Sequence, residues 1–247
     1  MKRYFPMLIL LLLHGACKKV ETPPATNPVG FNTTTYHTIG TYDESGKPSY
    51  LTTRDVVSAG LQSYVYTTLP EQTDLRQSNP ELLSSSATAD ISLTAKSSVS
   101  VTFVSQGTGF SNTIAFYTYP TNTPPASAAD IKSITYVFPN AGKGTTLTAG
   151  DKVNIGTFDT GTSIGFVLLK DAWNPTSKSI NTGAVHFCSN DVLNPEVDPK
   201  LKKHAVLTNY DAENKVLIGF EDINRTETEC DHDFNDVVVY ATVNPES

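Results

Sequence analysis

The chain has 247 residues and a formal net charge of −7 at pH 7. Because like charges repel, this balance disfavours nucleic acid and anionic membrane surfaces as partners. We therefore expect no nucleic-acid partner, and no membrane contact beyond a lipid anchor.

The N-terminus has the pattern of a secretory signal peptide, which we predict over residues 1–16. Lys2 and Arg3 precede the apolar run MLILLLL, which is too short to span a bilayer as a permanent helix. The sequence HGAC then places Cys17 where bacterial lipoproteins carry their lipid, although His14 stands where leucine is usual. The pattern predicts a protein that is lipid-anchored to the bacterial outer membrane and exposed at the cell surface. The alternative is a cleaved secretory peptide with an incidental cysteine.

The next segments lead into the main domain. Residues 17–30 are rich in proline and lack periodic apolar positions, which favours a flexible, lipid-anchored tether. Residues 31–95 are expected to form an N-terminal segment with one helix packed on the main domain. We predict that helix between Thr53 and Leu69, where apolar residues recur at intervals of three and four, although Gly60 weakens the pattern.

Beyond residue 90, runs of β-branched and aromatic residues alternate with turn residues, which is typical of a sandwich or jelly roll. Strands are predicted at residues 90–95, 98–104, 113–119, 133–138, 152–158, 163–169, 184–188, 204–208, 215–220 and 237–243. The predicted core consists of Phe103, Phe116, Phe138, Phe158, Phe166, Val167, Leu168, Phe220, Val237 and Val239. We therefore expect an all-β fold, an antiparallel, jelly-roll-like β-sandwich of calcium-binding type over residues 96–245.

An acidic connection separates the last two predicted strands, in the stretch LIGFEDINRTETECDHDFNDVVVY. Its acids would repel one another unless a cation neutralised them. Alternate residues from position 231 follow the opening of a D-x-D-x-N calcium loop, but Asp236 stands where an EF-hand requires glycine. The alternative is a solvated acidic hairpin whose side chains only form turns. The predicted ligands of a Ca2+ ion are Glu221, Asp222, Asp231, Asp233, Asn235 and Asp236.

Two cysteines remain besides Cys17. Because an exported chain enters an oxidising compartment, Cys188 and Cys230 are expected to form a disulfide if their strands are neighbours. Two buried free thiols are the alternative. A zinc site is disfavoured, because the chain has no C-x-x-C pair.

Several segments resemble the domain of unknown function that closes many secreted and surface bacterial proteins, including LruC-type lipoproteins. They cover about residues 96–243 and read VTFVSQGTGFSNTIAFYTYP, ITYVFPNAG, GTFDTGTSIGFVLLKDAWN, LNPEVDPKLKKH and IGFEDINRTETECDHDFNDVVVY. The last segment, with its FED and D-x-D-F-N-D elements, is the specific one. The resemblance implies a β-sandwich with a calcium site at the six residues named above, and it implies no agreed activity.

Other polar residues are weaker candidates. Asn112 could reach the acidic loop as a carbonyl ligand, but we interpret it as a turn residue. Asn194, Glu196 and Asp198 form a second acidic loop, which could hold a second ion or form the rim of a ligand site, although we interpret it as solvated. His204 opens a predicted strand, where a histidine is more often a hydrogen-bonded edge residue than a ligand or a base.

Trp173 lies in a predicted loop with Asp171 and Asn174, which makes this loop a candidate ligand-binding surface. An exposed aromatic face beside amide and carboxylate groups is typical of sugar-binding surfaces. The alternative is that the tryptophan closes one end of the sandwich.

These features favour a non-catalytic binding or adhesion module, with an extracellular glycan or protein as its partner. Acids clustered in one hairpin serve a metal better than acid–base catalysis, which needs two carboxyls in different environments about 5–10 Å apart. The alternatives are a carboxylate-dependent glycoside-processing enzyme and a structural component of the cell surface or matrix.

Overall fold

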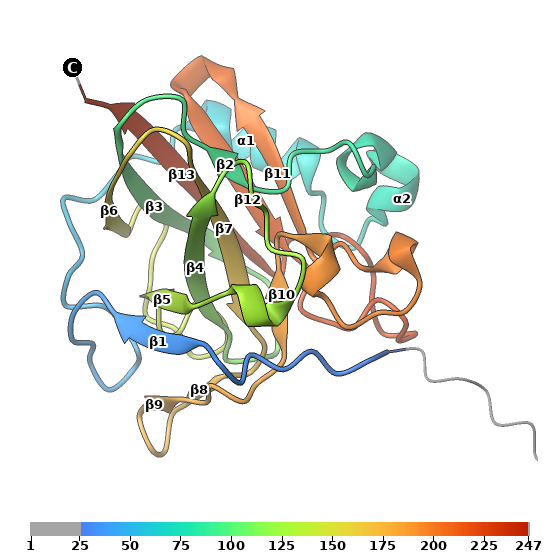
Figure 1. The fold of residues 1–247 in the computed structure, drawn as a ribbon. Helices are drawn as coiled ribbons and strands as arrows, with labels where there is room; N and C mark the ends of the chain where they lie inside the picture. The colour runs from blue at the N-terminus through green and yellow to red at the C-terminus, as the bar shows by residue number, and fades with distance from the viewer. Residues whose placement is uncertain (1–25, 247) are drawn as a thin grey trace, which may run out of the picture.

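The computed structural model of the protein describes residues 26–246 (Figure 1). The predicted signal peptide, Cys17 and most of the predicted tether lie outside the described residues. Within residues 26–246, no helix is both long enough and apolar enough to cross a membrane.

Two β-sheets form the centre of the molecule, and a separate two-stranded hairpin projects at the bottom of Figure 1. The larger sheet contains β1 (Thr35–Thr38), β5 (Ser133–Phe138), β4 (Thr113–Pro120), β7 (Thr162–Leu169) and β10 (His186–Cys188) in this order, with β2 (Ile91–Ser92) also paired to β7. The other sheet contains β11 (Ala205–Tyr210), β12 (Lys215–Phe220), β13 (Val237–Pro245), β3 (Ser97–Gln106) and β6 (Lys152–Phe158). The hairpin pairs β8 (Trp173–Asn174) with β9 (Ser179–Ile180).

The fold is therefore mostly β, as predicted, and all ten predicted strand regions contain strands. The prediction that every strand pairs antiparallel is wrong for β1, which runs parallel to β5. A parallel pair requires a long connection, and residues 39–132 supply one here. Both β1 and β2 precede residue 96 and are nevertheless strands of the larger sheet.

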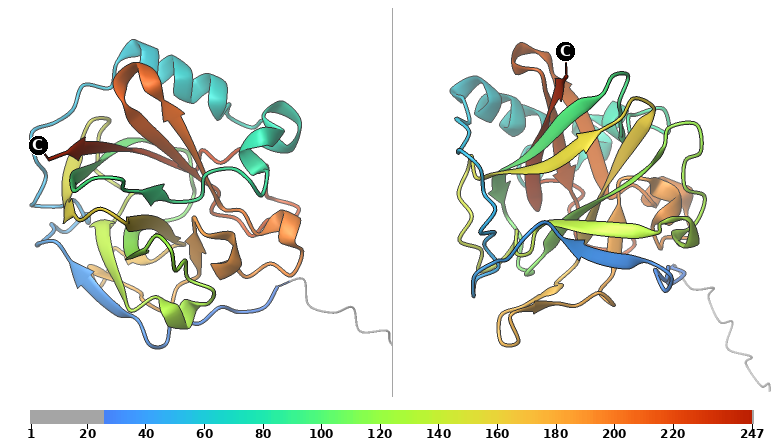
Figure 2. Two further views of the ribbon diagram at one scale, coloured as in Figure 1. Left: turned by 45° about the horizontal axis from the view of Figure 1, so that its top comes forward. Right: turned by 60° about the vertical axis from the view of Figure 1, so that its left-hand side comes forward.

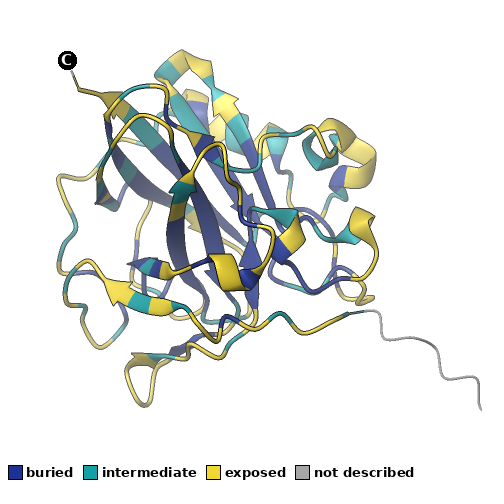
Figure 3. Cartoon of the chain, in the orientation of Figure 1, coloured by how far each residue is buried: buried dark blue, intermediate teal, exposed yellow. Residues whose placement is uncertain are grey.

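The main hydrophobic core lies between the two sheets. Phe103 of β3 contacts Phe138 of β5 edge to face, with ring centroids 6.2 Å apart, and Phe166 of β7 and Val239 of β13 belong to the same buried cluster. Most of the predicted core residues lie there. Val167 packs instead on the outer face of the larger sheet, because β4 and β7 are buried on both faces (Figure 3).

The helices cover the outer face of the smaller sheet (Figure 2). They are α1 (Ala59–Thr68), α2 (Leu75–Ser78) and the 3-10 helix η1 (Pro80–Leu83). Leu69 and Leu75 pack there against β11, β12 and β13. Further 3-10 helices are η2 (Ala128–Asp130), η3 (Asp191–Leu193), η4 (Pro199–Leu201) and η5 (Asp211–Glu213).

The predicted helix start at Thr53 is wrong. Helix α1 begins after Ser58, whose side chain accepts a hydrogen bond from the amide of Leu61 and so caps the helix. The preceding residues are held outside the helix by the start of β6, because the Asp55 amide donates to the carbonyl of Gly150 and the Asp55 carboxylate pairs with Lys152 at 3.0 Å.

The predicted disulfide is also wrong, because both thiols are free and buried. Cys188 lies on β10, in the cluster on the outer face of the larger sheet. Cys230 lies in the acidic loop, where its sulfur is 3.1 Å from Nδ1 of His232. The two cysteines therefore belong to different packing environments.

Candidate metal centre

The acidic loop, residues 221–236, is the connection between two paired strands. β12 and β13 run antiparallel with Phe220 opposite Val237, so the two ends of the loop lie side by side. Glu221 and Asp222 thus leave one strand where Asp236 enters the other. This is the arrangement that the strand pattern predicts.

Five of the six predicted ligands come together, in two groups that share one residue. One group is Glu221, Asp231 and Asp233, and the other is Glu221, Asp222 and Asp236. In each group, one carboxylate oxygen from every residue lies within 4.8 Å of the others. The sixth predicted ligand, Asn235, lies beside them. Its side-chain nitrogen donates a hydrogen bond to the backbone carbonyl of Leu69 at 3.3 Å.

Hydrogen bonds from distant segments hold the inner carboxylates in place. One oxygen of Asp222 accepts from the hydroxyl of Thr108 and from the amide of Asn112. The backbone amide of Asp222 in turn donates to Asp236 at 2.7 Å, which ties the two ends of the loop together.

The outer part of the loop is tied to the helical segment that covers it. The amide of Gln72, between α1 and α2, donates to Asp233 at 2.8 Å, and the amide of Leu75 donates to the carbonyl of His232 at 3.0 Å. The amide of Asn235 donates to the other oxygen of Asp233 at 3.1 Å. The helical segment therefore fixes the position of the Asp233 carboxylate.

The backbone of the loop is strained on both sides of Asp233. His232 and Phe234 have φ values of 61° and 59°, a left-handed conformation that is unfavourable for bulky residues. Phe234 is fully buried and lies 5.1 Å beneath the guanidinium of Arg225. Gly219 leaves room for the carbonyl of Phe234, because a Cβ at this position would collide with it. Packing around Phe234 therefore imposes a left-handed backbone conformation that these residues would otherwise avoid.

The carboxylates have no cationic partner among the described residues, since no lysine or arginine there forms a salt bridge with any of the five. Two oxygens, Oε2 of Glu221 and Oδ1 of Asp222, are buried without any hydrogen-bond partner. A buried acceptor without a partner costs about 1–3 kcal/mol, and a charged one more. The arrangement therefore lacks a cation in direct contact with these oxygens.

Burial and mutual repulsion oppose ionisation of these acids in the absence of a cation. Burial, together with Asp222 and Glu221, raises the pKa of Asp236 to about 9. Burial and the neighbouring Asp231 raise the pKa of Glu221 to about 7, and the same causes raise the pKa of Asp233 to about 6. Burial also raises the pKa of Asp222.

A second buried layer lies beneath Glu221. The backbone carbonyl of His204 accepts a hydrogen bond from the backbone amide of Glu221 at 3.0 Å. The ring Nδ1 of His204 donates a hydrogen bond to the backbone carbonyl of Glu221 at 2.9 Å. The other ring nitrogen is 2.8 Å from a carboxylate oxygen of Glu196, and the ring stacks on Phe187. His204 is hydrogen-bonded, as predicted, but it is fully buried and clamps the backbone of a candidate ligand.

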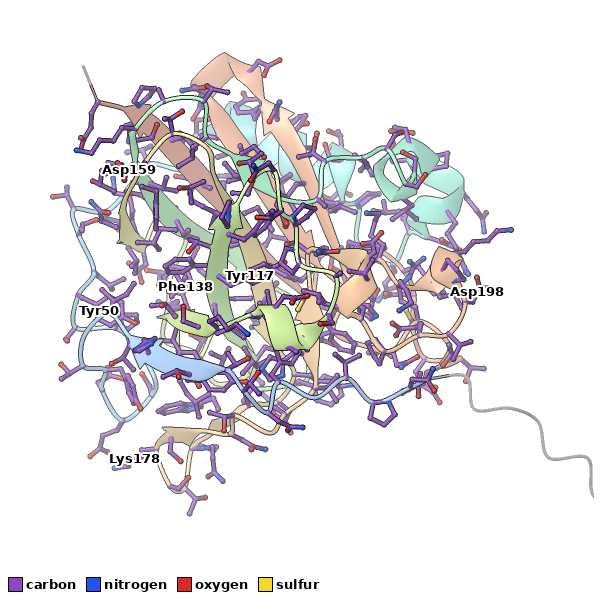
Figure 4. All side chains as sticks on the ribbon, viewed as in Figure 1. Tyr50, Tyr117, Phe138, Asp159, Lys178 and Asp198 are labelled. Atoms are coloured by element: carbon purple, nitrogen blue, oxygen red, sulfur yellow. The ribbon has the colours of Figure 1, made fainter. Side chains whose placement is uncertain are left out.

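The second acidic loop is only partly solvated. Asn194 and Glu196 are buried, and only Asp198 is exposed, at the rim of the molecule in Figure 4. Asn194 is buried because its amide oxygen accepts from the amide of Cys188 and its nitrogen donates to the carbonyl of Lys202. The prediction of a solvated loop therefore holds for Asp198 alone.

Asn112 reaches the acidic loop, contrary to the preferred interpretation as a turn residue. Its nitrogen donates to Asp222, and its oxygen accepts from the amide of Asp171 at 2.9 Å. Asn112 is fully buried. It therefore acts as a link between the acidic loop and the loop of Asp171, rather than as a carbonyl ligand.

The predicted ligand-binding residues Asp171, Trp173 and Asn174 line a cleft of about 700 Å³. Trp173 is only 3% exposed and packs edge to face on Tyr42. The indole therefore closes one end of the molecule, which is the alternative given for it, and offers no exposed aromatic face.

The donor set of the acidic loop fits a hard divalent cation. All candidate ligand atoms are oxygens, which Ca2+ and Mg2+ prefer over sulfur or imidazole. The sulfur of Cys230 and the imidazole of His232, both in the same loop, contact each other and belong to neither group. Sequence reasoning missed Thr108 and Gln72, because each comes from a segment with no acidic or periodic pattern that would mark it. It named Glu196, but as part of a solvated loop and not as the buried partner of His204.

Residues 158–244 match the family model of a domain of unknown function, DUF4114. The match extends from the end of β6 into β13 and includes the whole acidic loop. It confirms a domain of unknown function at the C-terminal part of the region expected from the resemblance. Neither a search of curated proteins nor a search of solved structures found a match.

Proposed function

We propose that this chain is an exported, non-catalytic binding module whose β-sheets are stabilised by calcium in the acidic loop. The observation that carries the proposal is a group of five carboxylates, four of them buried or half-buried, in which two buried oxygens have no hydrogen-bond partner and with which no described lysine or arginine forms a salt bridge. Calcium is the ion of choice, because it accepts six to eight oxygens in flexible geometry, whereas Mg2+ demands a near-ideal octahedron.

The proposed ligand surface is the cleft beside Trp173. Its lining includes side chains that can donate or accept hydrogen bonds, among them Ser111, Lys143, Asn174 and Asn181. A polar, hydroxyl-rich ligand such as a glycan matches this chemistry. The path from Asp222 through Asn112 to Asp171 supports a role for the ion in ordering the cleft.

A glycosidase is disfavoured as the alternative. The five acids lie together in one loop, whereas a glycosidase places its two carboxyls across a cleft. The cleft itself contains the carboxylates of Glu44 and Asp171, and both are exposed and already paired. Glu44 pairs with Lys178 at 2.8 Å, and Asp171 accepts from the amide of Ser111 at 3.0 Å. Neither is buried, whereas the general acid of a glycosidase typically lies in an apolar pocket.

Calcium titration of the purified chain in a calorimeter tests the proposal. We expect saturable binding, with about tenfold or greater loss of affinity in Asp233→Asn, since charge count tunes calcium affinity. Asp198→Asn is the matched control, because this exposed acid lies outside the loop. Absence of saturable binding would remove the basis of the proposal. If calcium binds, a glycan array read with calcium and with chelator then separates a glycan module from a structural component.

The proposed location is the bacterial outer membrane, with a lipid on Cys17 and the module exposed at the cell surface, as in LruC-type lipoproteins. Support comes from the apolar run and the small residues before Cys17. We expect mass spectrometry of the mature protein to find a lipidated N-terminal Cys17. An unprocessed N-terminus, or cleavage elsewhere without lipid, would contradict the anchor.

A further inference from the structure

The five carboxylates form two groups of the size that one ion requires. Calcium binds oxygens at about 2.3–2.6 Å, so two oxygens on one ion lie at most about 5.2 Å apart. The oxygens in each group satisfy this limit, being within 4.8 Å of one another. Glu221 is the only residue common to both groups.

The unpartnered oxygens point to a ligand beyond the protein. Glu221 and Asp222 are 0% and 1% exposed, yet Oε2 of Glu221 and Oδ1 of Asp222 have no hydrogen-bond partner. The opposite oxygen of each carboxylate is already engaged: Oε1 of Glu221 accepts from the amide of Ile223 at 3.2 Å, and Oδ2 of Asp222 accepts from Asn112. Each carboxylate is thus held on one side and left bare on the other. A bound cation would satisfy the bare oxygens.

The charge of the loop exceeds what one calcium ion neutralises. Five ionised carboxylates carry five negative charges, so one Ca2+ would leave an excess of about three and two would leave about one. Arg225 adds one buried positive charge, although its guanidinium donates to the carbonyls of Lys200 and Lys203 and to the ring of His232 and to none of the five carboxylates. With Arg225 counted, one Ca2+ would still leave an excess of about two negative charges, and two would leave about none. Buried charges must be compensated locally.

The two groups differ in depth and in what they join. In the inner group, Asp222 is buried and Asp236 half-buried, and their mutual hydrogen bond joins the two ends of the hairpin. In the outer group, Asp231 is exposed and Asp233 is bound to the amide of Gln72. An ion in the inner group would fasten the strands, and an ion in the outer group would fasten the helical segment.

We propose that the acidic loop holds two calcium ions bridged by Glu221, an inner ion that closes the hairpin and an outer, exchangeable ion beneath the α1–α2 connection. This inference rests on the proposed function, that the loop binds calcium. The two sites differ in exposure, because only the outer group contains an exposed carboxylate, that of Asp231.

Stoichiometry tests the inference. We expect calorimetric titration of the purified chain with Ca2+ to give about two equivalents. Asp231→Asn should lose the outer ion and keep one equivalent, and Asp236→Asn should lose the inner ion. Glu221→Gln should weaken both ions by about tenfold or more. Glu229→Gln is the matched control, because Glu229 is an exposed acid of the same loop that belongs to neither group.

The outcomes separate this inference from the proposed function. No binding would overturn both, whereas a single equivalent that Asp231→Asn and Asp236→Asn both weaken would overturn only the two-ion centre. Mn2+ offers a readout that needs no variant, because it binds carboxylate oxygens and is paramagnetic. Two Mn2+ ions bridged by one carboxylate are expected to show a spin-coupled resonance spectrum at saturation. A spectrum of isolated ions in the unmodified chain would exclude the bridge.

Discussion

Removing calcium is expected to lower the melting temperature of the protein by about 5–10 °C. The folded chain assembles the carboxylates of the acidic loop, whereas the unfolded chain disperses them, so calcium binds the native state preferentially. At a free concentration one hundred times the dissociation constant, such binding stabilises by about 2.7 kcal/mol. About 1 kcal/mol shifts the melting temperature of a domain of this size by roughly 2–4 °C. Thermal unfolding with calcium and with chelator measures the difference.

Asp233→Asn separates the charge of the loop from its metal. The asparagine keeps an oxygen and removes a charge, so in chelator this variant should be as stable as the unmodified protein or slightly more stable. Added calcium should raise the melting temperature of Asp233→Asn by less than that of the unmodified protein. Asp198→Asn should gain as much from calcium as the unmodified protein. Equal melting temperatures with calcium and with chelator would leave these acids as a charged surface without a metal.

The pH dependence of the free energy of unfolding, measured with and without calcium, tests calcium binding independently. The pKa values of Asp233, Glu221 and Asp236 are raised to about 6, 7 and 9, whereas carboxyls of the unfolded chain titrate near about 4. The metal-free native state therefore keeps protons that the unfolded state has lost. This stabilisation is complete below about pH 4 and is lost as the pH rises through the three folded-state values. Calcium favours the ionised carboxylates, so in calcium the fall should disappear.

Much of the strand pattern can be predicted from the sequence, because sheets impose their own signals. β5, β6 and β12 have the predicted bounds to the residue, since each has a compact apolar run between turn residues. β1 has no such apolar run. Its sequence is the polar TYHT, and its strand conformation comes from pairing with β5. The start of α1 cannot be predicted from local sequence, because Asp55 forms a salt bridge with Lys152, which is distant in the sequence.

The acids of the candidate site could be predicted because they lie close together in the sequence and in the hairpin. The residues that hold them could not. Asn112 and Thr108 meet Asp222 across more than a hundred residues, and neither belongs to a local motif. The left-handed backbone at His232 and Phe234 was equally hidden, because residues of this kind avoid that conformation unless packing imposes it.

The largest loss of stability from a single substitution outside the acidic loop is expected at the pair of Glu196 and His204. Both side chains are fully enclosed, and their polar atoms are 2.8 Å apart. The carbonyl of Glu221 can only accept, so Nδ1 of His204 carries a hydrogen. A second proton must lie between Nε2 and Glu196 for their contact to be favourable. Breaking a buried pair of this kind by removing one partner costs about 3–5 kcal/mol.

Glu196→Ala should therefore lower the melting temperature by about 6–20 °C, at roughly 2–4 °C per kcal/mol, and it should weaken calcium binding, because His204 holds the backbone of Glu221 on both sides. Glu196→Gln should cost less, about 1–3 kcal/mol, since the amide can still meet a neutral imidazole ring. Glu227→Ala is the matched control, an exposed glutamate whose loss should change stability by no more than about 0.5 kcal/mol. Denaturant unfolding and calcium titration of the three variants provide the measurement. If Glu196→Ala behaves like Glu227→Ala in both, the buried pair neither supports the fold nor positions Glu221, and the ligand is held by the hairpin alone.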